Sequence, residues 1–147
     1  LRDSKKADLV HLVIGGQQNS SGVAWGLNDI AGSPGWGFSV SHIGVTVSYH
    51  TFAHEMGHTL GCMHCWIPGP NETLGNGPFP YSHGHRWMGS DGKGYRSIMS
   101  YPKNGDTRIG QYSNPSVSYK GPPSGDASQA DNAKTLTQTI PVVSKYR

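Results

Sequence analysis

The chain has 147 residues and a formal net charge of +3, with 12 lysines and arginines against 9 aspartates and glutamates. A chain of this length can bury one hydrophobic core, so we expect a single domain over residues 1–147. The basic residues are scattered without a run of five, which argues against a nucleic-acid partner. No apolar stretch approaches the roughly 20 residues that cross a bilayer, which argues against a membrane partner.

Three short strands are predicted in the first third of the chain. Residues Asp8–Ile14 are rich in Leu, Val and Ile, which is typical of a strand buried on both faces, and a pair of glycines ends it. Residues Gly22–Trp25 and Gly37–Ser41 have the composition of two further short strands. The segment Ile43–Val47 either continues the strand before it or bulges away from it.

Residues 52–64 read F-A-H-E-M-G-H-T-L-G-C-M-H, which contains the pattern H-E-x-x-H-x-x-G-x-x-H. Residues four apart on an α-helix lie on one face, so the imidazoles of His54 and His58 can bind the same cation. Gly61 can take a positive φ and turn the chain back at the end of the helix. This turn would return His64 to the cation.

The chemistry of such a site follows from its ligands. Three neutral imidazoles leave one tetrahedral position of a zinc ion open, which separates a catalytic zinc site from a structural one. Zinc lowers the pKa of bound water to roughly 7 and polarises a substrate carbonyl. Glu55 is placed to take the proton of that water and to pass it to the leaving amine. The motif therefore predicts a zinc hydrolase, with His54, His58 and His64 as metal ligands and Glu55 as a catalytic residue.

Two principal helices are expected. The first carries the motif, begins near residues 48–51 and ends at Leu60. The second begins at a capping box formed by Ser128 and Asp131, and Pro141 should kink or interrupt it, because proline lacks the amide donor of a helix interior. With the short strands, these helices predict an α+β fold with one mixed sheet.

Between the two helices the segment Cys65–Gly94 is rich in glycine and proline, so it is expected to be mostly irregular. Cys62 and Cys65 flank the third histidine at the end of the motif. They form a short-loop disulfide, remain free thiols beside the site, or supply Cys65 as a further zinc ligand, which would close the position that water needs.

Downstream of the motif, residues 97–102 read S-I-M-S-Y-P. Together with the motif, this segment resembles the metzincin clan of zinc endopeptidases, whose members place a methionine in a tight turn, the Met-turn, beneath the zinc. By this resemblance Met99 is that methionine, packed under the imidazoles. Tyr101 is either a zinc ligand or oxyanion donor, as in astacin-like and serralysin-like metzincins, or an ordinary half-buried tyrosine. The resemblance also implies that Gly37–Ser41 is the edge strand along which an extended substrate lies.

A narrower resemblance covers most of the chain. The segments that carry it are Ala7–Val10, Gly22–Trp25, Gly37–Val40, Tyr81–Arg86, Tyr112–Pro115 and Ala130–Leu136. They resemble segments of bacterial reprolysin-like peptidases, and most of all of the secreted peptidyl-Asp metalloendopeptidases, which cut on the amino side of acidic residues. This resemblance implies a secreted zinc endopeptidase with protein or peptide substrates and a metzincin-like mixed sheet, an active-site helix and a C-terminal helix.

Three features depart from the family pattern. Cys65 follows the third histidine where reprolysin-like proteins usually carry Asp, the chain has only two cysteines, and only residues 1–6 precede the first predicted strand. The N-terminal strand and helix of the family are therefore expected to be missing or reduced, in a processed fragment or in a reduced version of the fold. We expect a monomer that can associate with its own N-terminal fragment or propeptide.

A pocket that selects acidic residues needs a cation. Arg86, Arg96, Lys103 and Arg108 lie in the segment that, by resemblance, forms the wall of this pocket. An arginine is the better candidate, because a guanidinium binds a carboxylate through two parallel hydrogen bonds. The alternative is that all four are solvated surface charges.

The competing functional hypothesis is a catalytically silent, zinc-containing binding module or an inactive fragment of a protease. The presence of Glu55 argues against it, because a domain kept only for its shape would tolerate Ala or Gln there. A calcium ion is a further hypothesis near Asp91–Gly94 or Asp106, where few carboxylates are available.

Overall fold

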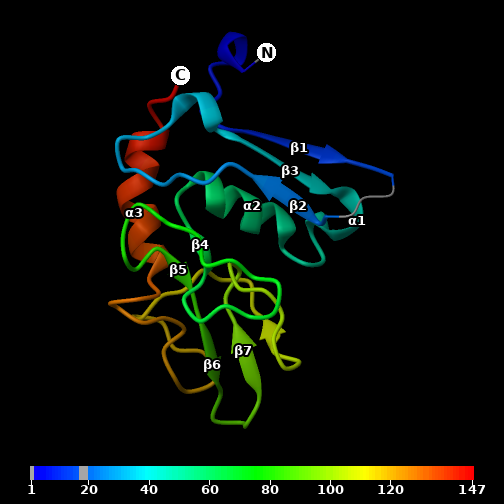
Figure 1. The fold of residues 1–147 in the computed structure, drawn as a ribbon, viewed down its shortest axis with the longest axis vertical. Helices are drawn as coiled ribbons and strands as arrows, with labels where there is room; N and C mark the ends of the chain where they lie inside the picture. The colour runs from blue at the N-terminus through cyan, green and yellow to red at the C-terminus, as the bar shows by residue number, and fades with distance from the viewer. Residues whose placement is uncertain (1, 17–19) are drawn as a thin grey trace.

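The computed structural model describes residues 2–16 and 20–147 and has the α+β class expected from the sequence. A sheet with a helix packed along it forms one half of the molecule, and a largely irregular region with a few short strands forms the other (Figure 1). The helical elements are η1 (Asp3–Lys5), η2 (Pro34–Trp36), α1 (Ile43–Thr46), α2 (Thr51–Thr59) and α3 (Asn132–Val143). The strands are β1 (Val10–Ile14), β2 (Gly22–Ala24), β3 (Phe38–His42), β4 (Met63–Cys65), β5 (His83–Gly84), β6 (Arg86–Met88), β7 (Gly94–Arg96) and β8 (Thr107–Arg108).

The first sheet is mixed, as predicted, with the strand order β1-β3-β2. β1 runs parallel to β3, with Val10 opposite Phe38, and β2 runs antiparallel to β3, with Val23 opposite Val40. β3 is therefore the central strand, and the expectation that Gly37–Ser41 forms the edge was wrong. Within the described residues, β2 is the edge strand on the side of the motif helix.

The expectation that the first strand is buried on both faces was also wrong. In β1, the Leu12 side chain is 58% exposed and Val13 is 45% exposed. α2 packs against β2 and β3, so β1 lies at the opposite edge and its apolar side chains remain in contact with solvent (Figure 1). His11 of β1 hydrogen-bonds the hydroxyl groups of Ser39 and Ser41, each at 2.7 Å, which satisfies both ring nitrogens.

The segment after β3 leaves the sheet and forms the short helix α1. The ring of His42 accepts a hydrogen bond from the Gly44 amide at 3.1 Å, which caps this helix. Of the two alternatives for Ile43–Val47, the bulge away from the sheet is therefore the one observed. The motif helix α2 follows almost at once, close to the predicted bounds.

The end of α2 is a left-handed turn. Gly61 has φ +90°, and the Cys62 amide donates to the Gly57 carbonyl at 2.8 Å, as in a helix C-cap closed by glycine. A Cβ at Gly61 would lie 2.9 Å from Cγ of Pro78. The turn directs the chain into β4, which pairs with β5 in a separate two-stranded sheet.

The C-terminal helix begins later and ends later than the sequence predicted. Asp131 caps α3 through its carboxylate, which accepts the Lys134 amide at 2.9 Å, so Ser128 lies outside the helix. Pro141 lies inside α3, which continues through Val143. The lost amide falls in the last turn, where the burial of Val143 and Tyr146 against Leu27 stabilises the helix.

The buried core is small and rich in hydroxyl groups. Cys62, Ile98 and Met99 form one apolar cluster, and a second cluster lies where α3 meets Leu27. Thr139 of α3 donates to the carbonyl of Leu60 at 2.7 Å, which ties the C-terminal helix to the end of α2. Within the described part of the chain, no helix has the length and apolar character needed to span a membrane.

Gly61→Ala is expected to lower the free energy of unfolding by about 1–2 kcal/mol, because alanine is strained at positive φ and its methyl group would press on Pro78. Urea unfolding followed by circular dichroism measures this difference. Gly15→Ala is the matched control, since no atom lies within 4 Å of a Cβ at Gly15. Equal stability of the two variants would contradict the role of the Gly61 turn.

Candidate metal centre

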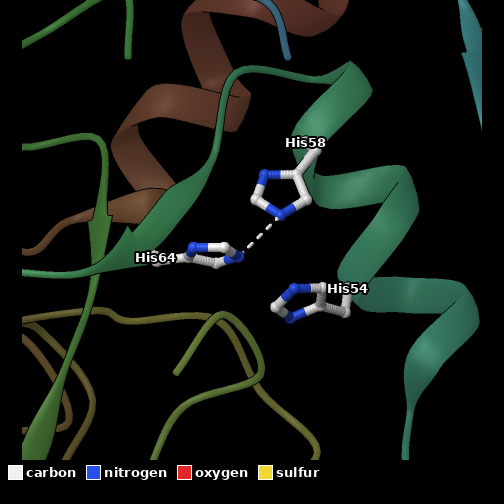
Figure 2. A group of neighbouring side chains, drawn as sticks. All are labelled: His54, His58 and His64. Atoms are coloured by element: carbon white, nitrogen blue, oxygen red, sulfur yellow. Dashed lines mark hydrogen bonds between the residues drawn. The ribbon is translucent and has the colours of Figure 1, made fainter. Parts of the chain in front are cut away.

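Three histidine rings meet where α2 faces β4 (Figure 2). α2 supplies His54 and His58, one turn apart, and β4 supplies His64. One ligand atom from each ring lies within 4.8 Å of the others, and Nε2 of His58 is 3.1 Å from Nε2 of His64. The structure thus brings the three predicted ligands together, while their role in binding metal stays a prediction.

The far sides of two of the rings, His54 and His64, are hydrogen-bonded to the backbone. Nδ1 of His54 donates to the Ile98 carbonyl at 3.0 Å, and Nδ1 of His64 donates to the Thr73 carbonyl at 2.7 Å. A carbonyl only accepts, so Nδ1 carries the proton in His54 and His64, and Nε2 of these two rings keeps its lone pair. Such outer hydrogen bonds are typical of histidines that bind metals.

The chemistry of the donor set, and the one separation between two of its nitrogens, fit a zinc ion. Zn–N bonds of about 2.1 Å in a tetrahedron place the ligand nitrogens about 3.4 Å apart, close to the His58–His64 separation. Burial, and then the neighbouring His58, hold the pKa of His54 well below its usual value. Burial and the charge of His64 lower the pKa of His58 to about 3. The rings are therefore neutral at physiological pH, the state in which imidazole binds a metal.

Glu55 lies beside these histidines in a confined position. Its side chain is buried, and burial raises the pKa of Glu55 to about 7, against the opposing charge of Arg108. A Cβ at Gly22 of β2 would lie 2.5 Å from Oε1 of Glu55. The carboxylate therefore fits against the edge strand only because residue 22 has no side chain.

Met99 and Tyr101 lie next to the histidines. The Tyr101 ring centroid is 4.6 Å from that of His64 and 5.8 Å from that of His54. Met99 is fully buried, and its sulfur would be 2.6 Å from a Cβ at Gly57, so it packs against α2 at Gly57. The catalytic role of Tyr101 and the Met-turn role of Met99 stay predictions.

A cavity of about 490 Å³ opens beside the centre. Glu55, Tyr101, Gly22, Arg96 and Arg108 are among the residues that line it. The cavity is therefore bounded by the motif helix, the edge strand β2 and the segment that follows Met99.

The two cysteines are free thiols in the structure, and both are buried. Burial raises the pKa of Cys65, so its thiol is protonated, and it lies outside the group of residues placed to hold a metal. The carboxylates considered for calcium are engaged with protein donors. Asp106 pairs with two arginines, and Asp91 accepts the Tyr95 hydroxyl at 2.8 Å.

Glu72 connects the loops around the centre, and the sequence analysis did not select it. One carboxylate oxygen accepts the amides of Cys65 and Tyr101, both at 3.0 Å, and the other lies 2.6 Å from the Arg86 guanidinium. Burial alone would raise the pKa of Glu72, but hydrogen bonds from the Gly69 amide, the Arg86 guanidinium and the Cys65 and Tyr101 amides together lower it. The one feature of the sequence that could have pointed to Glu72 is the scarcity of glutamate, since the chain has only two and the other is Glu55.

Comparisons with known proteins agree with this geometry. The model of metallo-peptidase family M12 matches residues 1–113. A peptidyl-Asp metalloendopeptidase of Stenotrophomonas maltophilia strain R551-3 is 33% identical over 99% of this chain and 33% of its own length. One of Xanthomonas campestris pv. campestris is 34% identical over 99% of this chain and 32% of its own length. The chain thus spans about a third of the length of these curated relatives, and no solved structure matches it significantly.

Glu72→Gln is expected to lower the free energy of unfolding by about 3 kcal/mol, because it leaves the half-buried Arg86 with less compensating charge and weakens the acceptor of two loop amides. Thermal and urea unfolding measure the loss.

Asp3→Asn is the control, because it removes an exposed ion pair with Arg147 and should leave stability almost unchanged. Equal changes in the free energy of unfolding for the two substitutions would show that the Glu72 network does not stabilise the fold.

Proposed function

The chain belongs to metallo-peptidase family M12, and we propose that it is a zinc-dependent endopeptidase that hydrolyses peptide bonds of extracellular proteins. The observation that carries the proposal is the convergence of three neutral imidazoles beside a buried glutamate at the wall of a cavity. The relatives are named metalloendopeptidases, and this chain aligns with about a third of their length, which supports the same activity.

In this proposal His54, His58 and His64 would hold one zinc ion, and the Nδ1 hydrogen bonds of His54 and His64 leave their Nε2 atoms free for it. The bound zinc supplies a Lewis acid that polarises the substrate carbonyl and makes water a stronger acid. Glu55 lies beside the ligands and lines the cavity, so its carboxylate takes the proton of the attacking water and delivers it to the leaving amine. The close contact with Gly22 holds this carboxylate in place.

The Tyr101 hydroxyl is proposed to stabilise the negative charge that develops on the carbonyl oxygen. Tyr101 lies against His64, and its backbone amide is fixed by Glu72. Burial, and then the charges of Glu55 and Glu72, raise the pKa of Tyr101, so its phenol stays a hydrogen-bond donor at neutral pH. Met99 packs beneath the ligands as the Met-turn residue.

The substrate is proposed to lie along β2. This strand pairs with β3 on one side, and its other side is unpaired within the described residues. An extended peptide can add to such an edge through backbone hydrogen bonds. Because Gly22 of β2 touches Glu55, a peptide bound there would present its backbone directly to the catalytic carboxylate.

An acidic residue on the primed side of the scissile bond is the proposed preference. The relatives are named peptidyl-Asp metalloendopeptidases, and two arginines line the cavity next to Glu55. A cationic cavity favours a carboxylate over a neutral side chain of the same shape.

Glu55→Gln is expected to lower kcat/KM by about 10³-fold while zinc content stays unchanged, because it removes the proton acceptor and no metal ligand. Mass-spectrometric mapping of cuts in a denatured protein mixture, with and without a chelator, measures the activity. His58→Ala is the control that should lose zinc and activity together. Cuts that survive both Glu55→Gln and the chelator would reject the proposal, and a zinc-loaded native chain that makes no cuts would favour the silent binding module.

Tyr101→Phe is expected to lower kcat by about 100-fold with little change in KM or zinc affinity, because a transition-state donor acts on the developing oxyanion alone. Steady-state kinetics and zinc titration separate these quantities. An unchanged kcat would make Tyr101 an ordinary half-buried tyrosine.

A further inference from the structure

The structure distinguishes the four cations that could select an acidic side chain. The Arg86 guanidinium lies 2.6 Å from Glu72 and 3.1 Å from Asp106, and Arg96 lies 2.7 Å from Asp106. Both charges are therefore compensated within the protein. Lys103 lies outside the lining of the cavity beside Glu55, whereas Arg108 is part of it.

Arg108 differs from Arg86 and Arg96 in its hydrogen-bond partners, which are backbone carbonyls rather than carboxylates. Nη1 donates to the Tyr49 carbonyl at 2.7 Å, and Nη2 donates to the Ser100 carbonyl at 2.9 Å. No carboxylate among the described residues lies within ion-pair distance of Arg108. Two neutral carbonyls thus fix the position of the guanidinium, and no carboxylate of the described residues pairs with it directly.

The guanidinium of Arg108 also has unused donors. It carries five N–H groups, of which the two bonds to carbonyls use two, so three have no acceptor in the described part of the chain. Nε is buried and is one of the three. A buried, charged donor without an acceptor is unfavourable unless a ligand completes its hydrogen bonds.

The surroundings of Arg108 match a carboxylate ligand. Burial, and then the charge of Arg96, lower the pKa of Arg108 to about 10, against the smaller opposing effects of Tyr101, Glu72 and Asp106. Glu55, the acidic residue that also lines the cavity, is the proposed proton acceptor of the reaction. A second carboxylate brought by a substrate would compensate the charge of Arg108 and accept its free N–H groups.

We propose that Arg108 is the specificity-determining residue of this site, and that it binds the side-chain carboxylate of an aspartate or glutamate in the substrate. The inference rests on the proposed endopeptidase function, and it names the group that would determine the substrate preference. An amide of the same shape, as in asparagine, would leave the charge of Arg108 uncompensated, so the discrimination is one of charge rather than size.

The first test measures binding without turnover. Two fluorescent peptides that differ only in Asp or Asn on the primed side are titrated against the zinc-loaded Glu55→Ala protein, and binding is followed by anisotropy. We expect the Asp peptide to bind about tenfold more tightly, and Arg108→Gln in the same background to abolish that ratio. Lys103→Gln is the matched control, because it removes the same charge from the same segment outside the cavity.

The second test compares kcat/KM for the same peptides in the protein with Glu55 intact. We expect the Asp-to-Asn ratio to fall about tenfold in Arg108→Gln and to stay unchanged in Lys103→Gln. Arg108→Lys should recover part of the ratio, since an ammonium keeps the charge and loses the two-pronged geometry. If Arg108→Gln unfolds at a lower temperature than the parent, the Lys variant carries the test.

The outcomes separate the inference from the function on which it rests. Equal Asp-to-Asn ratios in Arg108→Gln and the parent, or no Asp preference in the parent, would overturn the role of Arg108, even if the protein cuts peptides. A native chain that makes no cuts, yet binds the Asp peptide through Arg108, would overturn the endopeptidase proposal and support this inference.

Discussion

The candidate centre depends on the meeting of three imidazoles that come from two different elements. α2 brings His54 and His58 to one face, but His64 lies beyond the helix and reaches them only if the chain reverses at once. The left-handed Gly61 makes this reversal, and Pro78 fills the space where a side chain would lie. The end of α2 and the candidate metal site therefore depend on the same turn, because a regular helix would carry the third ring away.

The rest of the site is held mainly by polar contacts. The apolar clusters are small, and the segment from β4 to β8 contains few long aliphatic side chains. Glu72 instead joins the loop after His64 to the backbone of Tyr101, and Arg86 links Glu72 to Asp106. Buried ionic networks of this kind are sensitive to the loss of one member, since each remaining charge then lacks its partner.

Features that depend on short spacings could be predicted from the sequence. The shared face of His54 and His58 and the turn at Gly61 follow from helix geometry, and the structure contains both. The order of strands could not be predicted, because β3 becomes central through pairing with residues far away in the chain. The continuation of α3 through Pro141 has a similar cause, since distant packing decides whether the helix tolerates one missing hydrogen bond.

The arginines that follow the motif illustrate the same limit of prediction from the sequence. Arg86, Arg96 and Arg108 look equivalent in the sequence, where each follows the motif and none is preceded by a diagnostic pattern. Folding makes them different, because Asp106 reaches two of them and Glu72 reaches one. Arg108 donates to two backbone carbonyls, which orient the guanidinium without neutralising its charge. In the proposed role of Arg108, a carboxylate of the substrate supplies the ion-pair partner that the protein does not. Selectivity for an acidic residue would then follow from which arginines the protein pairs with its own carboxylates.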